Sequence, residues 1–201
     1  MAETSANVDG RRERSEATRR NILNSARALI LQGDFDPTAQ AIAKHSGITR
    51  RTLFRHFPDM ETLHHEIIID AQLYAQTVMD EPFPQNTTKW STQIEVVIER
   101  RVRIFEYLMP LYISAVYQSY RTTSSRKSRR GGNQRRRARL EQVLPSNMVS
   151  NNLLLESLNA ILSIDYWITL RQDQQLTVTE ATKVLGYAVC QMTGLTTDPD
   201  R

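Results

Sequence analysis

The sequence predicts an all-α protein, on three observations. Only 7 of its 201 residues are glycine, about half the usual frequency of roughly 7%. The chain therefore has few glycines for the many turns of a β-sandwich, a barrel or a Rossmann sheet. Apolar residues recur at helical spacing over most of the chain. Capping residues, glycines and prolines bound these periodic segments. We therefore expect a small N-terminal three-helix domain and a larger C-terminal helical domain.

Composition excludes several classes of protein. A single cysteine, Cys190, rules out an internal disulfide framework and a Cys-based zinc site. Residues 1–14 contain no apolar leader, and the apolar runs are far shorter than the ~20 residues of a membrane helix. We therefore expect a cytoplasmic protein that needs no cofactor. The net charge of +4 is modest, so the distribution of charge matters more than its sum.

The first helix is predicted over about 16–32. Its apolar residues keep helical spacing, Ser15 can cap its start, and Gly33 closes it. Residues 1–14 are polar, with three arginines and nothing apolar to bury. We expect them to form a flexible basic arm, which either enters a DNA minor groove or stays disordered.

Two short helices follow the first. Thr38 can cap one that ends at Gly47, and Thr49 can cap another that ends before Pro58. None of these brief helices is stable alone, so they must share a core. We place the N-terminal domain at residues 15–59.

The larger domain is expected at residues 60–195, followed by a tail at 196–201. Its apolar periodicity predicts amphipathic helices separated by prolines and polar turns. Pro110 divides two of them, and Thr177 or Thr179 caps the last. The expected helices are 60–80, 91–107, 111–120, 150–172 and 178–194.

An arginine-rich stretch interrupts this domain at residues 121–139. It holds nine Lys and Arg residues without any Asp or Glu, together with paired serines and paired glycines. Such a composition repels itself and cannot bury a core. We expect a mobile, solvated loop with a short helix after it, and nucleic-acid contact is the alternative.

Residues 38–57 carry the pattern of a helix-turn-helix motif. Two short helices meet at Gly47, where a positive φ angle is expected. Small Ala43 permits a close crossing, and Ile48 fills the angle between the helices. The alternative is an ordinary pair of core helices, but it leaves the adjacent Arg50 and Arg51 unexplained.

The second helix of this motif carries the residues suited to DNA. If its start enters the major groove, Arg50 and Arg51 reach base edges, where arginine to guanine is the commonest specific contact. Gln40, near the start of the preceding helix, can reach a base as well. Other side chains suit phosphate oxygens, which set register rather than sequence: Thr38, Thr49, Thr52, Arg55 and His56.

This stretch closely resembles the DNA-binding domain of the TetR family of bacterial transcriptional regulators. The resemblance runs from Ile22 to Leu63, with hallmarks at Ala26, Gly33, Thr38, Ile42, Ala43, Gly47, Ile48, Thr49, Thr52, Leu53, His56, Phe57 and Glu61. It implies an all-helical homodimer that binds a pseudo-palindromic operator. It also implies a repressor that releases DNA when a small-molecule effector enters the C-terminal domain.

Two positions depart from the family pattern. Phe54 stands where members usually carry Tyr, so ring packing remains without the phosphate-binding hydroxyl. Met60 stands where members usually carry Lys, so the start of the next helix lacks the ammonium group that contacts the DNA backbone. Arg50, Arg51 and Arg55 supply nearby charge that compensates.

The segment from Trp167 to Thr177, followed by Glu180, looks like the end of the regulatory domain in part of this family. The effector site itself is less legible. Aromatic residues suited to an apolar pocket are Tyr107, Tyr112, Tyr117, Tyr166 and Trp167, with Met109 and Tyr120 beside them. The alternative is that most of them are ordinary core residues. Asp165 lies among apolar residues and should find a structural partner.

Other functions find less support in the sequence. An enzyme needs a nucleophile, an acid-base pair or a phosphate loop, and no candidate for any of these is present. His64 and His65 are adjacent and face different directions on a helix, so they cannot bind one metal ion, and the sequence predicts no metal site. A helical adaptor with a vestigial motif, and nonspecific packaging of nucleic acid through the arginine-rich stretch, remain as alternatives to a sequence-specific regulator.

Overall fold

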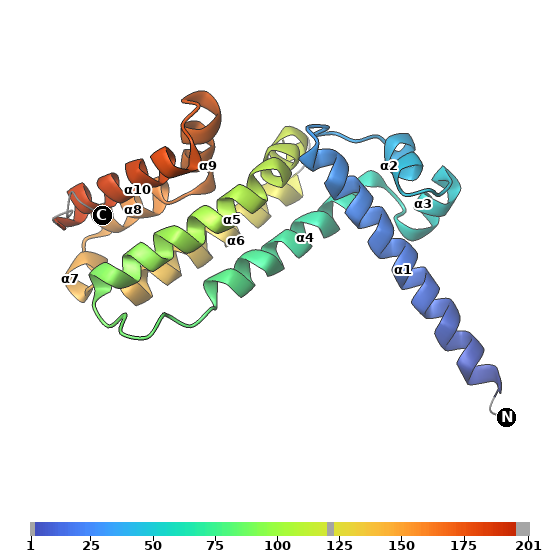
Figure 1. The fold of residues 1–201 in the computed structure, drawn as a ribbon, viewed down its shortest axis with the longest axis horizontal. Coiled ribbons are helices and arrows are strands. Elements are labelled where there is room, and N and C mark those ends of the chain that lie inside the picture. Colours follow the sequence, from blue (N-terminus) through green and yellow to red (C-terminus); the bar gives the residue numbers. More distant parts are fainter. Residues whose placement is uncertain (1–2, 120–122, 196–201) are drawn as a thin grey trace. The chain divides into compact units, whose positions relative to one another are not determined.

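A computed structural model describes residues 3–119 and 123–195 and places side chains at 10–114 and 131–195. Within that part of the chain it contains helices and no strand (Figure 1), which confirms the predicted all-α class. The elements are α1 (Glu3–Leu31), α2 (Ala39–His45), α3 (Arg50–His56), α4 (Met60–Met79), α5 (Trp90–Ser119), α6 (Thr123–Val143), α7 (Ser146–Val149), α8 (Asn152–Ile161), α9 (Ile164–Ile168), the π-helical turn η1 (Thr169–Asp173) and α10 (Val178–Thr193).

The chain divides into two compact units. The first contains Met1–Leu73 and Pro110–Arg121, and the second contains Tyr74–Met109 and Thr122–Arg201. Helices α4 and α5 therefore each contribute to both units. The domain boundary expected at residue 59 stays a prediction, and the predicted tail at 196–201 lies outside the described residues.

The core of the first unit explains why its short helices form. It consists of buried residues from α1, α2, α3 and α4, with Phe57 just after α3, and each is at most 2% exposed: Ile22, Ala26, Ile42, Leu53, Phe57, Leu63 and Ile67. Helices of seven residues are not stable in water by themselves. Helices α2 and α3 are therefore held by this shared core rather than by their own hydrogen bonds.

Helix α1 begins at Glu3, so the prediction of a flexible arm before residue 15 is wrong. The absence of apolar residues indicated an arm, but a helix that is anchored at one end extends without burying anything. Arginine, alanine and glutamate favour that extension, and Arg12 pairs with Glu16 one turn later.

Pro110 does not divide α5, which runs unbroken from Trp90 to Ser119. The prediction of two helices here is wrong because a proline removes only one backbone hydrogen bond. A long helix packed on both sides of the proline can tolerate that loss. Pro110 is nevertheless the residue at which α5 passes from the second unit to the first.

The arginine-rich stretch is helical from Thr123 onward, and the prediction of a mobile loop is wrong there. Residues 120–122 lie outside the described part. Arginine and glutamine are good helix formers, and buried Leu140 and Val143 anchor the end of α6. The repulsion that we expected is relieved at its end because Arg137 pairs with Glu141 and Glu156 and Arg139 pairs with Asp80.

The helix predicted over 150–172 is interrupted at Ser163. Helix α8 ends at Ile161, and the hydroxyl of Ser163 then accepts a hydrogen bond from the Tyr166 amide at 3.2 Å to cap α9. A serine side chain competes with helical backbone bonds in this way. Periodicity alone missed the break because the apolar spacing continues through it.

No single described helix is long and apolar enough to cross a membrane. The bent pair formed by α8 and α9 with η1 passes by length and composition only, and its Leu155, Leu158 and Trp167 are buried inside the protein.

Helix α10 begins with a capping box at Thr177, which decides between the two caps that the sequence left open. The Thr177 hydroxyl accepts a hydrogen bond from the Glu180 amide at 3.2 Å, and the Thr177 amide donates to the Glu180 carboxylate at 2.8 Å. The Thr177 hydroxyl also donates to the Glu180 carboxylate at 2.7 Å, and this bond, together with the one from the Thr177 amide, lowers the pKa of Glu180. The carboxylate therefore stays charged at the positive end of the helix.

The cap can be tested with two neighbouring threonines. We expect Thr177→Ala to lower the free energy of unfolding by about 1 kcal/mol because a backbone donor loses its acceptor. Thr179→Ala, at an exposed position inside the same turn, should change it by less than about 0.5 kcal/mol. Urea denaturation of both variants measures the difference, and equal losses would contradict the assignment.

Candidate nucleic-acid interface

The turn between α2 and α3 has the geometry that the motif requires. Thr38 caps α2 by accepting a hydrogen bond from the Ala41 amide at 3.2 Å. Gly47 follows the helix with a φ angle of 70°, which confirms the predicted positive φ. The amide of Ile48 then donates to the carbonyl of Ala43 at 3.0 Å, which closes the turn. The chain thereby reverses within three residues and starts α3 against the same core.

Helix α3 presents a basic outer surface. Thr49 caps it by accepting from the Thr52 amide at 3.2 Å, and Leu53 is fully buried beneath it. Arg50, Arg51 and Arg55 are exposed. Because the buried Leu53 fixes which face points inward, these three guanidinium groups point toward solvent.

The remaining predicted contact residues surround this surface. Thr38 and Gln40 are exposed at the start of α2. The hydroxyls of Thr49 and Thr52 lie 3.0 Å apart and bond to each other. Phe54 is 37% exposed, with the Arg50 guanidinium carbon 5.9 Å from its ring centroid. The capping threonines thus serve the fold of the motif, and their role toward phosphate stays a prediction.

His56 ends α3 in a partly buried position. Its pKa is lowered, first by burial and then by the positive charges of Arg55 and Arg19. Its ring Nε2 has no hydrogen-bond partner among the described residues. The lowered pKa keeps the imidazole mostly neutral at pH 7, and its Nε2 is buried rather than open to solvent.

Sequence reasoning missed Arg19, which holds the end of α3. From α1, its guanidinium donates to the backbone carbonyl of His56 and pairs with Glu66 of α4. It also lies 4.1 Å from the ring centroid of Phe57. The signal was present, since Arg19 stands three residues before buried Ile22 on the same helical face.

Asn21 is a second residue that the sequence analysis missed. Its side-chain amide donates to the carbonyl of Ser46 at 2.9 Å. Ser46 is the last residue before Gly47, so this bond ties the turn of the motif to α1. Asn21 of α1 therefore holds the turn, just as Arg19 of α1 holds the end of α3.

The start of α4 is fixed by Asp59, whose carboxylate accepts a hydrogen bond from the Thr62 amide at 2.7 Å. This bond and the one to the Thr62 side chain lower the pKa of Asp59. The charged cap therefore favours the folded state above the ordinary carboxyl pKa and is lost as pH falls through the lowered value. Met60, where the family usually carries lysine, is half-buried at the first position of α4.

The aromatic residues predicted to line an effector pocket lie in different environments. Trp167 is fully buried, with its ring centroid 6.2 Å from that of Phe105. Tyr107 instead packs against Tyr74, with the two ring centroids 4.0 Å apart and the rings tilted by 39°. Tyr166 is half-buried in the second unit, and Tyr112 is half-buried in the first. The side chain of Tyr117 and all of Tyr120 lie outside the described residues.

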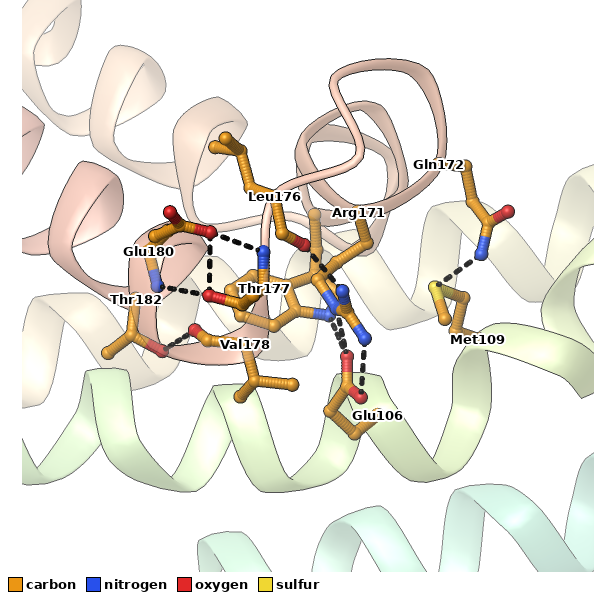
Figure 2. Close-up of polar contacts among 10 residues, drawn as sticks. Glu106, Met109, Arg171, Gln172, Leu176, Thr177, Val178, Glu180 and Thr182 are labelled. Atoms are coloured by element: carbon orange, nitrogen blue, oxygen red, sulfur yellow. Dashed lines mark hydrogen bonds and ion pairs between the residues drawn. The ribbon is translucent and has the colours of Figure 1, made fainter.

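Trp167 belongs to a polar cluster that holds η1 against α5, and Figure 2 labels its members Glu106 and Arg171. The indole N–H donates to Glu106 at 2.8 Å, and the Arg171 guanidinium pairs with the same carboxylate at 3.0 Å. Arg171 also donates to the carbonyl of Leu176. Glu106 therefore joins α5 to the turn that leads into α10. Sequence reasoning noticed Trp167 and Arg171 but not their common acceptor.

Asp165, for which we predicted a structural partner, is exposed at the start of α9.

Among the described residues, no three His, Cys, Asp or Glu side chains are grouped to hold a metal ion.

The fold and this basic helix define the class of protein: a helical protein with a helix-turn-helix DNA-binding motif. Residues 22–67 match the family described as bacterial regulatory proteins, tetR family. This match supports a TetR family regulator, that is, a DNA-binding transcriptional regulator. Regulators of this family are generally non-enzymatic. No curated protein matches the chain.

The role of Arg19 predicts a difference between two adjacent arginines. We expect Arg19→Met to lower the free energy of unfolding by about 1–2 kcal/mol, after allowing for solvent screening of its half-exposed ion pair. Arg20→Met, at an exposed position, should change it by less than about 0.5 kcal/mol. Guanidinium denaturation compares them, and a silent Arg19→Met would show that α3 is held by packing alone.

Proposed function

We propose that this regulator is a ligand-responsive repressor that binds a pseudo-palindromic operator as a homodimer in the cytoplasm. The observation that carries the DNA-binding part is the exposed row of Arg50, Arg51 and Arg55 on a helix whose buried side is fixed by Leu53. A rigidly held helix can place side chains at base edges without paying to order itself at each encounter.

We assign different tasks to the basic residues of this surface. Arg50 and Arg51, in the first turn of α3, read base edges in the major groove, and Gln40 reads a neighbouring base. Arg55, one turn further on, contacts the phosphate backbone. We assign a phosphate contact to the half-buried His56 at the end of α3 as well. Thr38, and the one of Thr49 and Thr52 that accepts in their mutual hydrogen bond, keep a hydroxyl proton for phosphate oxygens.

The surface of α8 and α10 supports a homodimer. These helices pack side by side through buried Leu155, Leu158 and Leu185 (Figure 1). Their other faces leave Leu153 82% exposed and Tyr187 62% exposed. Exposed large apolar residues of this kind are common at protein interfaces. Two copies joined here would form a four-helix interface and carry two recognition helices about 34–36 Å apart.

The response to an effector requires that its binding change operator affinity. Helix α4 begins immediately after the recognition helix and continues from the first unit into the second. A molecule bound in the second unit can therefore act on the motif through a continuous helix. It must bind the DNA-free state more tightly than the DNA-bound state, because only differential affinity shifts the equilibrium.

A matched pair of variants tests base reading. Using DNA from upstream of the protein's own gene, we expect Arg51→Ala to remove most of the preference for the best site over scrambled DNA, a loss of about 1–3 kcal/mol. Arg55→Ala should weaken binding to both DNAs equally and reduce the salt dependence by about one phosphate contact. Titration across salt concentrations measures both. Binding of wild-type protein that ignores sequence would favour the helical adaptor or the packaging protein.

The dimer is tested by mass. At micromolar concentration we expect sedimentation equilibrium to give about twice the chain mass of 23.2 kDa. Tyr187→Arg should convert the protein to monomers because it places a charge in the apolar contact. Leu31→Arg, at another exposed apolar position, is the control and should leave the dimer intact. A monomeric wild type would contradict the proposed dimer and the spacing of about 34–36 Å between its two recognition helices.

A further inference from the structure

Helix α1 continues well beyond the core of the first unit. Among its described side chains, Ile22 is the first that is fully buried, whereas the helix begins at Glu3. All residues from 11 to 17 are exposed, which covers a full turn of the helix on every side. Figure 1 shows no other helix of the first unit beside this part of α1. We call residues 10–18 the α1 extension, and no packing within the described part of the chain explains it.

One face of the α1 extension is basic. Arg11, Thr18 and Ile22 are separated by seven and then four residues, so they lie in one line along the helix. Arg14 lies beside this line because it is three residues after Arg11 and four residues before Thr18. Its Nε donates to the carbonyl of Gly10 at 2.8 Å. The line that is apolar and buried at Ile22 is therefore cationic and exposed closer to the N-terminus.

The acidic side chains of the extension do not balance this charge. Glu13 is two residues after Arg11, and Glu16 is two residues after Arg14. Residues two apart on a helix do not face each other. Glu16 instead pairs with Arg12 at 3.2 Å. Among the described side chains, neither Arg11 nor Arg14 has a carboxylate within 4 Å. The face in line with the core thus carries two unpaired guanidinium groups.

The extension leaves the first unit beside α3. Asn21 bonds the carbonyl of Ser46, just before α3, and Arg19 bonds the carbonyl of His56, at the other end of α3. Helix α1 therefore crosses the buried side of α3 near residues 19–22. Packed helices lie about 8–10 Å apart, and the major groove is about 8.5 Å deep. When α3 fills the groove, α1 is consequently at the height of the phosphates along its edge.

We propose that the α1 extension is a second DNA contact, in which Arg11 and Arg14 bind phosphates beside the major groove that α3 enters. A guanidinium group matches a phosphate in charge and in hydrogen-bond geometry. The minor groove does not admit this segment, because the groove is about 6 Å wide and a helix with its side chains is about 10–12 Å across. A second helix does not fit this face, since it has no apolar seam.

This proposal rests on the proposed reading of DNA by α3 and extends the surface that does so. Phosphate contacts carry no sequence information, so the extension adds affinity and salt dependence on any duplex. The preference among sequences stays with α3. The extension also fixes the orientation of the first unit on the duplex, because Arg11 is about 16 Å along the helix from Ile22.

The direct test compares matched arginine variants of the full-length chain. We expect Arg11→Gln to weaken DNA binding about fivefold at ~0.15 M salt, and to reduce the slope of log affinity against log salt by about 0.9, because one phosphate contact is lost. Arg14→Gln should do the same independently. Arg20→Gln is the control, since this exposed arginine is nine residues after Arg11 and lies on the opposite side of the helix. It should leave the slope unchanged.

Fluorescence anisotropy across salt concentrations measures these slopes. Glutamine forms helices about as well as arginine, so the variants keep α1, and far-UV circular dichroism verifies that they do. A wild-type slope in both Arg11→Gln and Arg14→Gln would overturn the proposal and favour an acidic protein as the partner of this face. An equal loss in Arg20→Gln would also overturn it, because the effect would then come from net charge alone.

Two duplexes separate this proposal from the one on which it rests. Each variant is titrated with DNA from upstream of the protein's own gene and with scrambled DNA of equal length. If the wild type binds both equally, sequence reading by α3 fails, while the slopes of the variants still decide the role of the extension. If the wild type prefers the upstream DNA and neither Arg11→Gln nor Arg14→Gln changes the slope, the extension contact alone is refuted.

Discussion

The attachment of the recognition helix depends on one arginine of α1. A helix of seven residues has too few internal hydrogen bonds to fix its own shape, and α3 buries only Leu53 inside its length. Arg19 supplies what packing does not, because it bonds the last carbonyl of α3, covers the ring of Phe57 and pairs with Glu66. Arg19 thus joins three helices at the point where α3 ends and the chain continues into α4. The proposed reading of DNA by the exposed arginines requires that this junction be rigid.

Arginine performs three physically different tasks in this chain. On α3 it is exposed and hydrated by solvent, as the proposed contacts with DNA require. In the second unit it pairs with carboxylates, and these pairs hold α6 and η1 in place, as Arg139 does with Asp80 and Arg171 with Glu106. At Arg101 it is buried with carbonyls only. The environment of each guanidinium, rather than its count in the sequence, therefore separates recognition from structure.

The residues of the candidate interface were largely predictable because the motif is local. Threonine caps, a glycine with positive φ and a buried leucine all lie within 20 residues, so spacing along the chain fixed which side chains face outward. The supports of that interface were not predictable in the same way. Arg19 and Glu66 are 47 residues apart, and Asn21 bonds a carbonyl 25 residues away. No local pattern specifies such partners. The role of the aromatics in an effector pocket stays a prediction, and Tyr107 and Trp167 each have an aromatic packing partner.

The sequence by itself determined the all-helical class, the helix-turn-helix motif and the basic outer face of α3, because periodicity, caps and glycine conformation act over a few residues. Tertiary structure decided the rest. It extended α1 beyond the expected arm, carried α5 through Pro110, turned the arginine-rich stretch into α6, and broke the helix before α9 at Ser163. Each of these outcomes depends on where distant groups lie: an anchored helix can extend without apolar residues, and a charged one is stable once carboxylates of other helices reach it.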